Sequence, residues 1–274
     1  MNQLPENTWL TANYCSCWSG ILVVDGKHIK IKDYKKKIPF IYGIDYLKHD
    51  LPVGILSPSE NKEAFFKFFT LLKICHYPLQ IVICDDVLSA LKEPLLRVYP
   101  KARIQLCQTH YLENIRQVLN IRTDETYHHF FNSLIKHVFR DPQNKKQREK
   151  GLYHVYIKYA KNNQVLEYIL VDIVKKQDYL FAYEKIFHCP KTTNIIESSN
   201  SHLQGRLKSV KGFQSFHSAE RWLNAWLLRR RTKPYTDCNK PFKHLNGKMP
   251  LEMIIKKQAQ WPEILGVQAP ISER

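Results

Sequence analysis

The stretch IVICDDVLSA, residues 81–90, constrains the fold of this chain more than any other. Four apolar residues in a row, Ile81 to Cys84, predict a short strand that is buried on both faces. Two aspartates, Asp85 and Asp86, follow it at once, although buried charge is costly unless it is paired or bound to a metal. The stretch therefore predicts a sheet with a charged site at the end of this strand.

Three further strands are expected before this one. GILVVDGKHIKI (20–31) is an apolar run that turns into alternation, and IPFIYGIDYL (38–47) and PVGILS (52–57) follow it. The basic link KDYKKK (32–37) is short enough to join the first two strands as an antiparallel hairpin. The chain thus begins its sheet with three strands in a meander.

Helices and two strands come next. Ser57 and Glu60 resemble the N-cap and the capping-box glutamate of a helix that would end before the strand 79–84. After the aspartates, LSALKEPLLRVY predicts a helix interrupted or kinked at Pro94, and then ARIQL (102–106) predicts a fifth strand. From residue 108 to about 187 the apolar pattern is almost wholly helical.

The expected order β-β-β-α-β-α-β, followed by helices, is that of an RNase H-like α/β domain with a mixed five-stranded sheet. The large all-α insertion would lie between the second and third acidic residues discussed below. The sequence divides into an N-terminal extension (1–19), the first part of the core (20–107), the helical insertion (108–190), the second part of the core (191–235) and a C-terminal tail (236–274). In that tail, PFKHLNGKMPLEMIIK predicts a turn and a final packed helix.

The charge balance indicates a polyanionic partner. Lys and Arg number 42 against 25 Asp and Glu, which gives a formal net charge of +17. Such an excess favours nucleic acid through neutralisation of phosphates and release of counterions. A basic surface that serves only solubility is the alternative, because composition alone defines no binding site.

The cysteines and the apolar runs suggest a compartment. Seven cysteines are an odd number, several lie in apolar runs, and no signal peptide precedes them. This usage fits a reducing cytoplasm, and no apolar run is long enough to cross a bilayer. We therefore expect a cytoplasmic bacterial protein that associates with the nucleoid when it is bound to DNA.

Two carboxylates are expected to meet at the sheet. In the RNase H-like order the first and fourth strands are adjacent and parallel, so Asp25 in the first would face an acid at the end of the fourth. Two such groups repel each other unless a cation lies between them, and hard oxygen ligands suit Mg²⁺. Successive side chains on a strand point to opposite faces, so only one of Asp85 and Asp86 can take part, and Asp85 is preferred. Asp86 is instead a candidate N-cap of the next helix.

A third acid is expected from a helix beside that edge of the sheet. The candidate is Glu197 in TTNIIESSNSHLQGRLKS (192–209), where Ile196, Leu203 and Leu207 would face the core. Asn194 and Glu197 also have the spacing of a capping box, so spacing alone leaves open whether Glu197 is a metal ligand or a helix cap.

These motifs together resemble those of DDE transposases of the Mutator-like (MULE) superfamily, including bacterial insertion-sequence relatives. The matching segments are VVDGKHIKI around Asp25, the run that begins IVICDDVLSALKEPLLRVYPKARIQLCQTHYLENI, and the helix around Glu197. The resemblance covers about residues 20–235. It implies Asp25, Asp85 and Glu197 as a metal-binding catalytic triad that uses two Mg²⁺ or Mn²⁺ ions.

The same resemblance points to a Cys-x-x-His motif after the fifth strand, matched by Cys107 and His110. It favours an accessory role for this pair near the catalytic site, while a buried structural pair is the alternative. A structural zinc site would need two more ligands, such as Cys15 and Cys17, which are far away in sequence. CQTH alone is a weak zinc signal.

Basic side chains near these motifs are candidate contacts to DNA phosphates. They lie in the predicted hairpin loop, after Glu197 and at the end of a later helix: Lys35, Lys36, Lys37, Arg206, Lys208, Lys211, Arg229, Arg230 and Arg231. Solvated loops and helix ends are the alternative. Trp222 and Trp226 in that later helix are expected to belong to the core rather than to stack on bases.

The resemblance implies a transposase that cleaves DNA strands and transfers them to target DNA by a two-metal mechanism, as a homodimer or a higher multimer. A transposon-derived protein that binds DNA without cutting it and an RNase H-like junction resolvase are the alternatives. The family generally carries an N-terminal region that recognises transposon ends, and only about 20 residues precede the first strand here. A fragment, a misassigned start and end recognition elsewhere remain open explanations.

Overall fold

The computed structural model describes residues 4–236 and 238–256. Its centre is a mixed five-stranded sheet in the order β3-β2-β1-β4-β5. The strands are β1 (Ile21–Ile29), β2 (Ile38–Asp45), β3 (Gly54–Leu56), β4 (Ile81–Cys84) and β5 (Arg103–Leu106). The α-helices are α1 (Asn7–Tyr14), α2 (Lys62–Ile74), α3 (Leu88–Val98), α4 (Gln108–Val118), α5 (His128–Leu134), α6 (Lys145–Val155), α7 (Gln164–Leu180), α8 (Asn194–Val210) and α9 (Phe216–Thr232).

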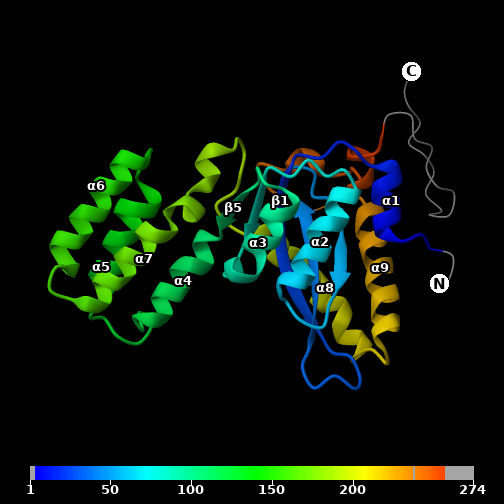
Figure 1. Ribbon diagram of the computed structural model, residues 1–274, viewed down its shortest axis with the longest axis horizontal. Coiled ribbons are helices and arrows are strands. Elements are labelled where there is room, and N and C mark those ends of the chain that lie inside the picture. The colour runs from blue at the N-terminus through cyan, green and yellow to red at the C-terminus, as the bar shows by residue number, and fades with distance from the viewer. Residues whose placement is uncertain (1–3, 237, 257–274) are drawn as a thin grey trace.

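Strand pairing confirms the predicted meander and the central parallel pair. β1 and β2 are antiparallel, as are β2 and β3, whereas β4 is parallel to both β1 and β5. The parallel ladder ends at the pair Val23–Ile83, and Asp25 and Asp85 each follow two residues later, close enough for the charge of Asp25 to raise the pKa of Asp85. Beyond Asp25, β1 continues to Ile29 and remains paired with β2, so the hairpin extends further than β4 does (Figure 1).

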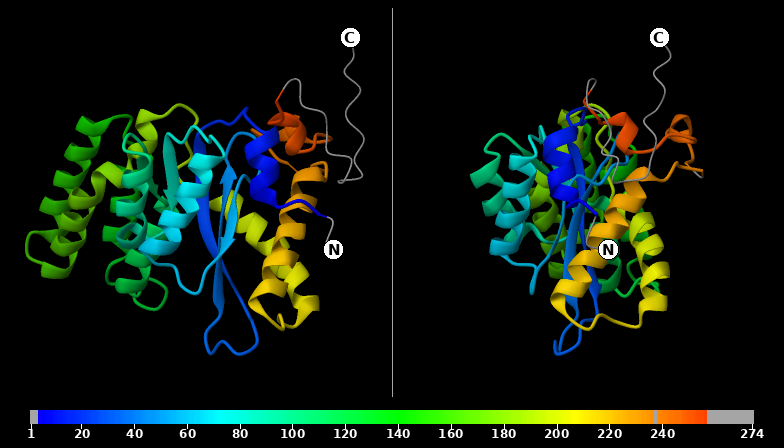
Figure 2. Two further views of the ribbon diagram at one scale, coloured as in Figure 1. Left: turned by 45° about the vertical axis from the view of Figure 1, so that its right-hand side comes forward. Right: turned by 90° about the vertical axis from the view of Figure 1, so that its right-hand side faces the viewer.

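Alternating side chains of β1 supply two hydrophobic cores, one on each face of the sheet. Leu22 and Val24 pack under α2 and α3, whereas Ile21 and Val23 pack under α8 and α9. Figure 2 shows this arrangement with the sheet seen edge-on between the two helical layers. Because successive side chains alternate, Asp25 lies on the same face as Val23, which is the face that α8 covers.

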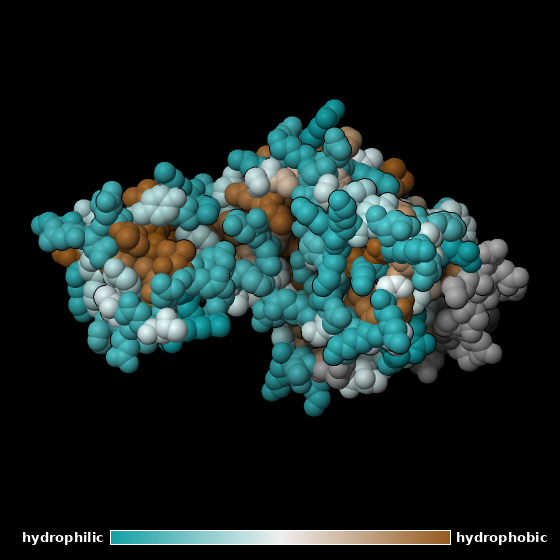
Figure 3. Space-filling model, turned by 90° about the horizontal axis from the view of Figure 1, so that it is seen from below, coloured by the Kyte–Doolittle hydropathy of each residue, from teal (hydrophilic) through white to brown (hydrophobic). Residues whose placement is uncertain are grey.

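A helical part follows β5 and extends from one side of the sheet (Figure 1). It contains α4 to α7, and short π-helical segments, Ile135–Arg140 and Tyr156–Ala160, continue α5 and α6. Brown apolar surface gathers over this part in Figure 3. Its exposed apolar side chains include Tyr153, Ile157, Tyr168 and Val174.

Three local expectations are corrected. α2 starts at Lys62 with Asn61 as its N-cap, whose side chain accepts a hydrogen bond from the Ala64 N–H, so Ser57 and Glu60 do not cap it. α3 runs through Pro94 without interruption. The expected C-terminal helix is instead a pair of 3₁₀ turns, Lys243–Leu245 and Leu251–Met253; residues 257–274 of the predicted tail lie outside the described residues.

The N-terminal extension contains the helix α1, which packs against α9 and which the sequence did not predict. Its buried face carries the polar residues Asn7 and Thr11, so apolar periodicity does not reveal it. Both side chains accept hydrogen bonds from the guanidinium of Arg231, at 2.7 Å and 2.8 Å.

Arg231 is therefore removed from the candidate DNA contacts. Its side chain is fully buried and forms an ion pair with the equally buried Asp50, with 2.9 Å between Nε and Oδ1. The spacing held a signal for this: Leu223, Leu227 and Arg231 follow one another at intervals of four, which puts Arg231 on the buried stripe of α9. The network joins α1, α9 and the segment after β2.

Replacing Arg231 by Met should lower the free energy of unfolding by about 3–5 kcal/mol, because Asp50 would remain buried without a countercharge. Urea denaturation of the purified chain measures this. Arg229→Met is the matched control, since the exposed Arg229 lies on the same helix and its loss should change stability by less than about 0.5 kcal/mol. Equal denaturation midpoints for the two variants would contradict a stabilising role for the network.

In the described part of the chain, none of the helices combines the length and the apolar character needed to cross a membrane.

Candidate active site

Three carboxylates from distant parts of the sequence approach one another at the end of β4. Asp25 lies within β1, Asp85 directly follows β4, and Glu197 lies in the first turn of α8. The parallel register of β1 and β4 sets the first two side by side, and α8 crosses the same face of the sheet. Asp86 is not part of this group, although it directly follows Asp85 in the bend after β4. Its exposed side chain lies with Ser89 and Lys92 at a different depression of the surface.

Asp25 is held by two hydrogen bonds. Its Oδ1 accepts from the Gly26 N–H at 2.7 Å, and its Oδ2 accepts from Asn200 Nδ2 at 2.5 Å. Asn200 Oδ1 in turn accepts from the Tyr42 hydroxyl at 2.8 Å, which fixes the orientation of the amide. Through Asn200, α8 and the neighbouring strand β2 together hold the Asp25 carboxylate in one orientation.

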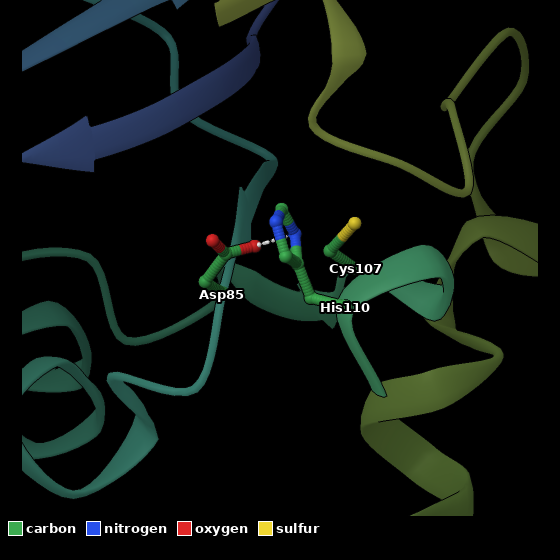
Figure 4. A group of neighbouring side chains, drawn as sticks. All are labelled: Asp85, Cys107 and His110. Carbon is green, nitrogen blue, oxygen red and sulfur yellow. Dashed lines mark ion pairs between the residues drawn. The ribbon is translucent and has the colours of Figure 1, made fainter. Parts of the chain in front are cut away.

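Asp85 faces His110 of α4, with 2.5 Å between Oδ1 and Nδ1 (Figure 4). Glu197 Oε1 lies 3.9 Å from the same ring nitrogen. Among the described residues, His110 is the basic side chain that forms ion-pair contacts with this group. One imidazole cannot neutralise three carboxylates, so negative charge remains at the site.

Burial and mutual repulsion raise the pKa values of Asp25 and Asp85. Burial raises the pKa of Asp25 above its ordinary value, while the hydrogen bonds from Gly26 and Asn200 act in the opposite direction. Burial raises the pKa of Asp85 to about 6, His110 opposes this rise, and the charges of Asp25 and Glu197 add to it. Carboxylates that resist ionisation together are stabilised as anions when a cation lies between them.

Thr193 connects the elements around the three acids. Its hydroxyl lies 2.9 Å from Glu197 Oε1, 3.2 Å from Cys107 Sγ and 3.4 Å from Asp85 Oδ1. A hydroxyl has one proton to donate, and the shortest of these contacts is to Glu197. Thr193 is buried and precedes α8 directly, so it sets both the start of the helix and the position of the Glu197 carboxylate.

The alternative of a capping box formed by Asn194 and Glu197 is not observed. The N-cap of α8 is Thr193, without a side-chain capping bond, and Asn194 is already the first helical residue. Asp86 does not cap α3 either, because the N-cap there is Val87. Neither Glu197 nor Asp86 therefore caps a helix, although the sequence had left that role open for both.

Cys107 and His110 lie at the beginning of α4, beside Asp85 (Figure 4). Cys107 is buried, its Sγ accepts a hydrogen bond from the Thr193 N–H, and the same sulfur lies 3.2 Å from the Thr193 hydroxyl. Ligand atoms of Asp85, Cys107 and His110 lie within 4.8 Å of one another, which is compact enough to hold a metal ion. Cys15 does not join them, because it lies against Arg231 instead.

Glu60 is a further acid that sequence reasoning assigned only to a helix cap. Burial raises the pKa of Glu60 above its ordinary value, and the charge of Asp25 adds to this rise. A Cβ on residue 26 would lie 1.4 Å from Glu60 Oε1, so the carboxylate occupies the space beside Gly26. A glycine directly after Asp25 was the available signal, because Gly marks close approach by another group.

The remaining predicted residues lie on the surface. Lys35, Lys36 and Lys37 are exposed in the hairpin loop, and Arg206, Lys208, Lys211 and Arg229 are exposed on or next to α8 and α9. Arg230 is half-buried, and Trp226 belongs to the core as expected.

Comparison with known proteins identifies relatives of the chain. The family model described as "Transposase, Mutator family" matches residues 21–233, a range that holds Asp25, Asp85 and Glu197. Two curated proteins named "Transposase for insertion sequence element IS256 in transposon Tn4001", from Staphylococcus aureus and from Enterococcus faecalis (strain ATCC 700802 / V583), are each 23% identical over 177 residues. These alignments cover 64% of this chain and 44% of each relative, so the aligned part spans less than half the length of these relatives.

Thr193→Val should weaken Mn²⁺ binding about 10- to 100-fold, because Val keeps the shape of the side chain but removes the hydrogen bond that orients Glu197. Calorimetric titration of the chain with Mn²⁺ measures the affinity. Thr192→Val, one residue earlier and half-exposed, is the matched control and should bind as the parent does. An unchanged affinity in Thr193→Val would show that the hydroxyl does not position a metal ligand.

Proposed function

Because this chain belongs to the Mutator family of transposases, we propose that it is the catalytic part of an enzyme that cleaves DNA strands and transfers them to target DNA. Asp25, Asp85 and Glu197 are the proposed catalytic residues. The observation that carries the proposal is the convergence of these three acids at one end of β4, from three separate elements.

The donor set fits divalent cations. The three carboxylates supply hard oxygen ligands of the kind that Mg²⁺ and Mn²⁺ prefer. The charges of neighbouring carboxylates raise the pKa values of Asp25 and Asp85, and a bound cation would stabilise the ionised forms together. We propose two ions, which would supply Lewis acidity to the attacking and the leaving oxygen of the phosphodiester.

The chain's own residues supply the orientation. Asn200 and the Gly26 N–H hold the Asp25 carboxylate, and Thr193 holds Glu197. His110 Nδ1 lies 2.5 Å from Asp85 Oδ1, so His110 favours the ionised form of Asp85 and directs its carboxylate into the site. Cys107 acts as a positioning residue, because it accepts a hydrogen bond from the N–H of Thr193, the residue that precedes α8. No Ser or Cys nucleophile is required by this scheme.

The fold is proposed to be RNase H-like. The strand order with a parallel β1–β4 pair at its centre supports this, because it is the order that brings acids of the first and fourth strands together. Residues 20–107 and 191–235 would form the catalytic core, and residues 108–190 a helical insertion between Asp85 and Glu197. The flanking segments 1–19 and 236–274 complete this division, although α1 packs on the core.

DNA is the proposed partner. The exposed Lys35, Lys36 and Lys37 extend beyond the site on the β1–β2 hairpin, and Arg206, Lys208, Lys211, Arg229 and Arg230 lie along α8 and α9. The formal net charge of +17 favours this partner. We also propose a homodimer or higher multimer on the DNA, and association with the bacterial nucleoid in the cytoplasm.

The test of the catalytic proposal is strand cleavage and joining of labelled duplex DNA in Mg²⁺ or Mn²⁺. Asp25→Asn, Asp85→Asn and Glu197→Gln should each lower cleavage by more than about 100-fold, because each removes a charge that holds metal directly. Binding of the same DNA should change little in all three variants. Chelation of the metal should abolish cleavage by the parent.

Asp86→Asn is the matched control, since this neighbouring acid is not part of the group, and it should cleave as the parent does. Full activity in any of the three variants would remove that residue from the triad. If the parent binds DNA but does not cut it, the alternative of a transposon-derived DNA-binding protein replaces the proposal. Preference for branched junctions over linear duplex would favour a resolvase.

A further inference from the structure

Two cavities adjoin along one side of α8, away from the three acids. The first, of about 340 Å³, lies between α8 and α9 and is lined by Arg206, Trp222 and Arg229. The second, of about 530 Å³, lies between α8 and the segment around Phe242. His202, Arg230 and Tyr235 line both, so the two cavities adjoin, and we refer to them together as the groove.

The groove has one sign of charge. The first cavity is lined by Arg206, Arg229, Arg230 and Lys233, and Lys240 lines the second. Among the described residues, neither lining set contains Asp or Glu. A concave, low-dielectric wall with cations and without described acids attracts an anionic ligand, and the planar guanidinium is well suited to phosphate.

Aromatic rings form part of the same walls. Trp222 is half-buried in the first cavity, in contrast to the buried Trp226 beside it. In the second cavity the half-buried Phe242 ring lies 5.1 Å from Tyr46 and 4.3 Å from His49, measured between ring centroids. Arginines combined with exposed faces of aromatic rings are the pairing that binds the phosphates and bases of unpaired nucleic acid.

Polar atoms in the walls lack partners within the protein. Arg230 Nε and His49 Nε2 are buried, and among the described residues they have no hydrogen-bond partner. Both side chains line the second cavity, although these two nitrogen atoms have almost no accessible surface. Buried polar groups in folded proteins nearly always have a partner, so these atoms would gain one from ordered water or from a ligand toward which the side chains turn.

The groove is coupled to the candidate active site by α8 itself. Ser198, Ser199 and His202 line the groove, while Glu197 and Asn200 of the same helix face the acids. From residue 198 to residue 206 the helix rises about 12 Å, the length of about three to four stacked nucleotides. A strand in the groove would thus lie directly behind the proposed catalytic edge.

We propose that this groove binds an unpaired segment of a DNA strand, with phosphates on Arg206, Arg229 and Arg230 and a base stacked on Trp222. The proposal rests on the proposed function for the choice of DNA as the polyanion. Cavities of a few hundred cubic ångströms suit single nucleotides, whereas a duplex is a wide, convex rod that meets a surface from outside. The groove therefore holds strand that has left the duplex close to the site of cleavage.

The test is binding of short oligonucleotides in the absence of metal, in the otherwise complete chain that carries Asp25→Asn. The probes are a labelled single strand of about ten nucleotides, a size typical of one binding domain, and the corresponding duplex. Arg229→Glu should weaken single-strand binding at least about fivefold and duplex binding clearly less. Lys150→Glu on the distant α6 makes the same change in charge at an exposed site and should weaken both probes little and equally.

A second measurement follows the base itself. A 2-aminopurine placed in the single strand should be quenched on binding, and Trp222→Leu should reduce the quenching and lower the affinity about fivefold or more through the loss of one stack. Trp222→Phe, which retains a ring to pack against Phe213, should keep most of both.

Three results would overturn the proposal: equal losses for single strand and duplex in Arg229→Glu, equal effects of Lys150→Glu, or unchanged quenching in Trp222→Leu. None of these readouts depends on cleavage. A chain that binds single strand in the groove but never cuts DNA would overturn the catalytic proposal alone. If the parent cuts DNA but the parent and Arg229→Glu bind single strand equally well, the groove proposal alone would be overturned.

Discussion

The parallel pairing of β1 with β4 is the constraint on which the rest of the site depends. Its register sets Asp25 beside Asp85, and the alternation of side chains turns both toward the face covered by α8. Two carboxylates in this position repel each other, which destabilises the fold locally and favours the binding of a cation between them. The apolar residues of both strands, buried on either face, offset that cost.

α8 has two sides with different chemistry. One side brings Glu197 and Asn200 to the acids, and the other lines a groove of cations and aromatic rings. The start of the helix is set by Thr193, whose contacts to Cys107 tie it to β5 and α4. Because both sets of residues belong to the same helix, the distance between the proposed strand-binding groove and the carboxylates is fixed by α8 and does not depend on a loop.

Much of the sheet could be predicted, because short-range patterns report on it. Apolar runs and alternation located all five strands, and the brief basic link identified the β1–β2 hairpin. The preference for Asp85 over Asp86 followed from alternation alone. Helix starts were less well predicted: Ser57 with Glu60 and Asn194 with Glu197 have capping-box spacing, but Asn61 and Thr193 occupy the N-cap positions, because tertiary contacts decide where each helix begins. α1 was missed because its buried face is polar.

The sequence by itself determined the strands, the two central acids and the family resemblance, since each depends on residue type and local spacing. Only the tertiary structure decided what each polar group contacts. Arg229, Arg230 and Arg231 are identical neighbours in sequence, yet the exposed Arg229 and the half-buried Arg230 line the groove, whereas Arg231 is buried against Asp50, 181 residues away. The helical rotation of about 100° per residue gives each a different environment, and those environments are built from segments that the chain brings together only when it folds.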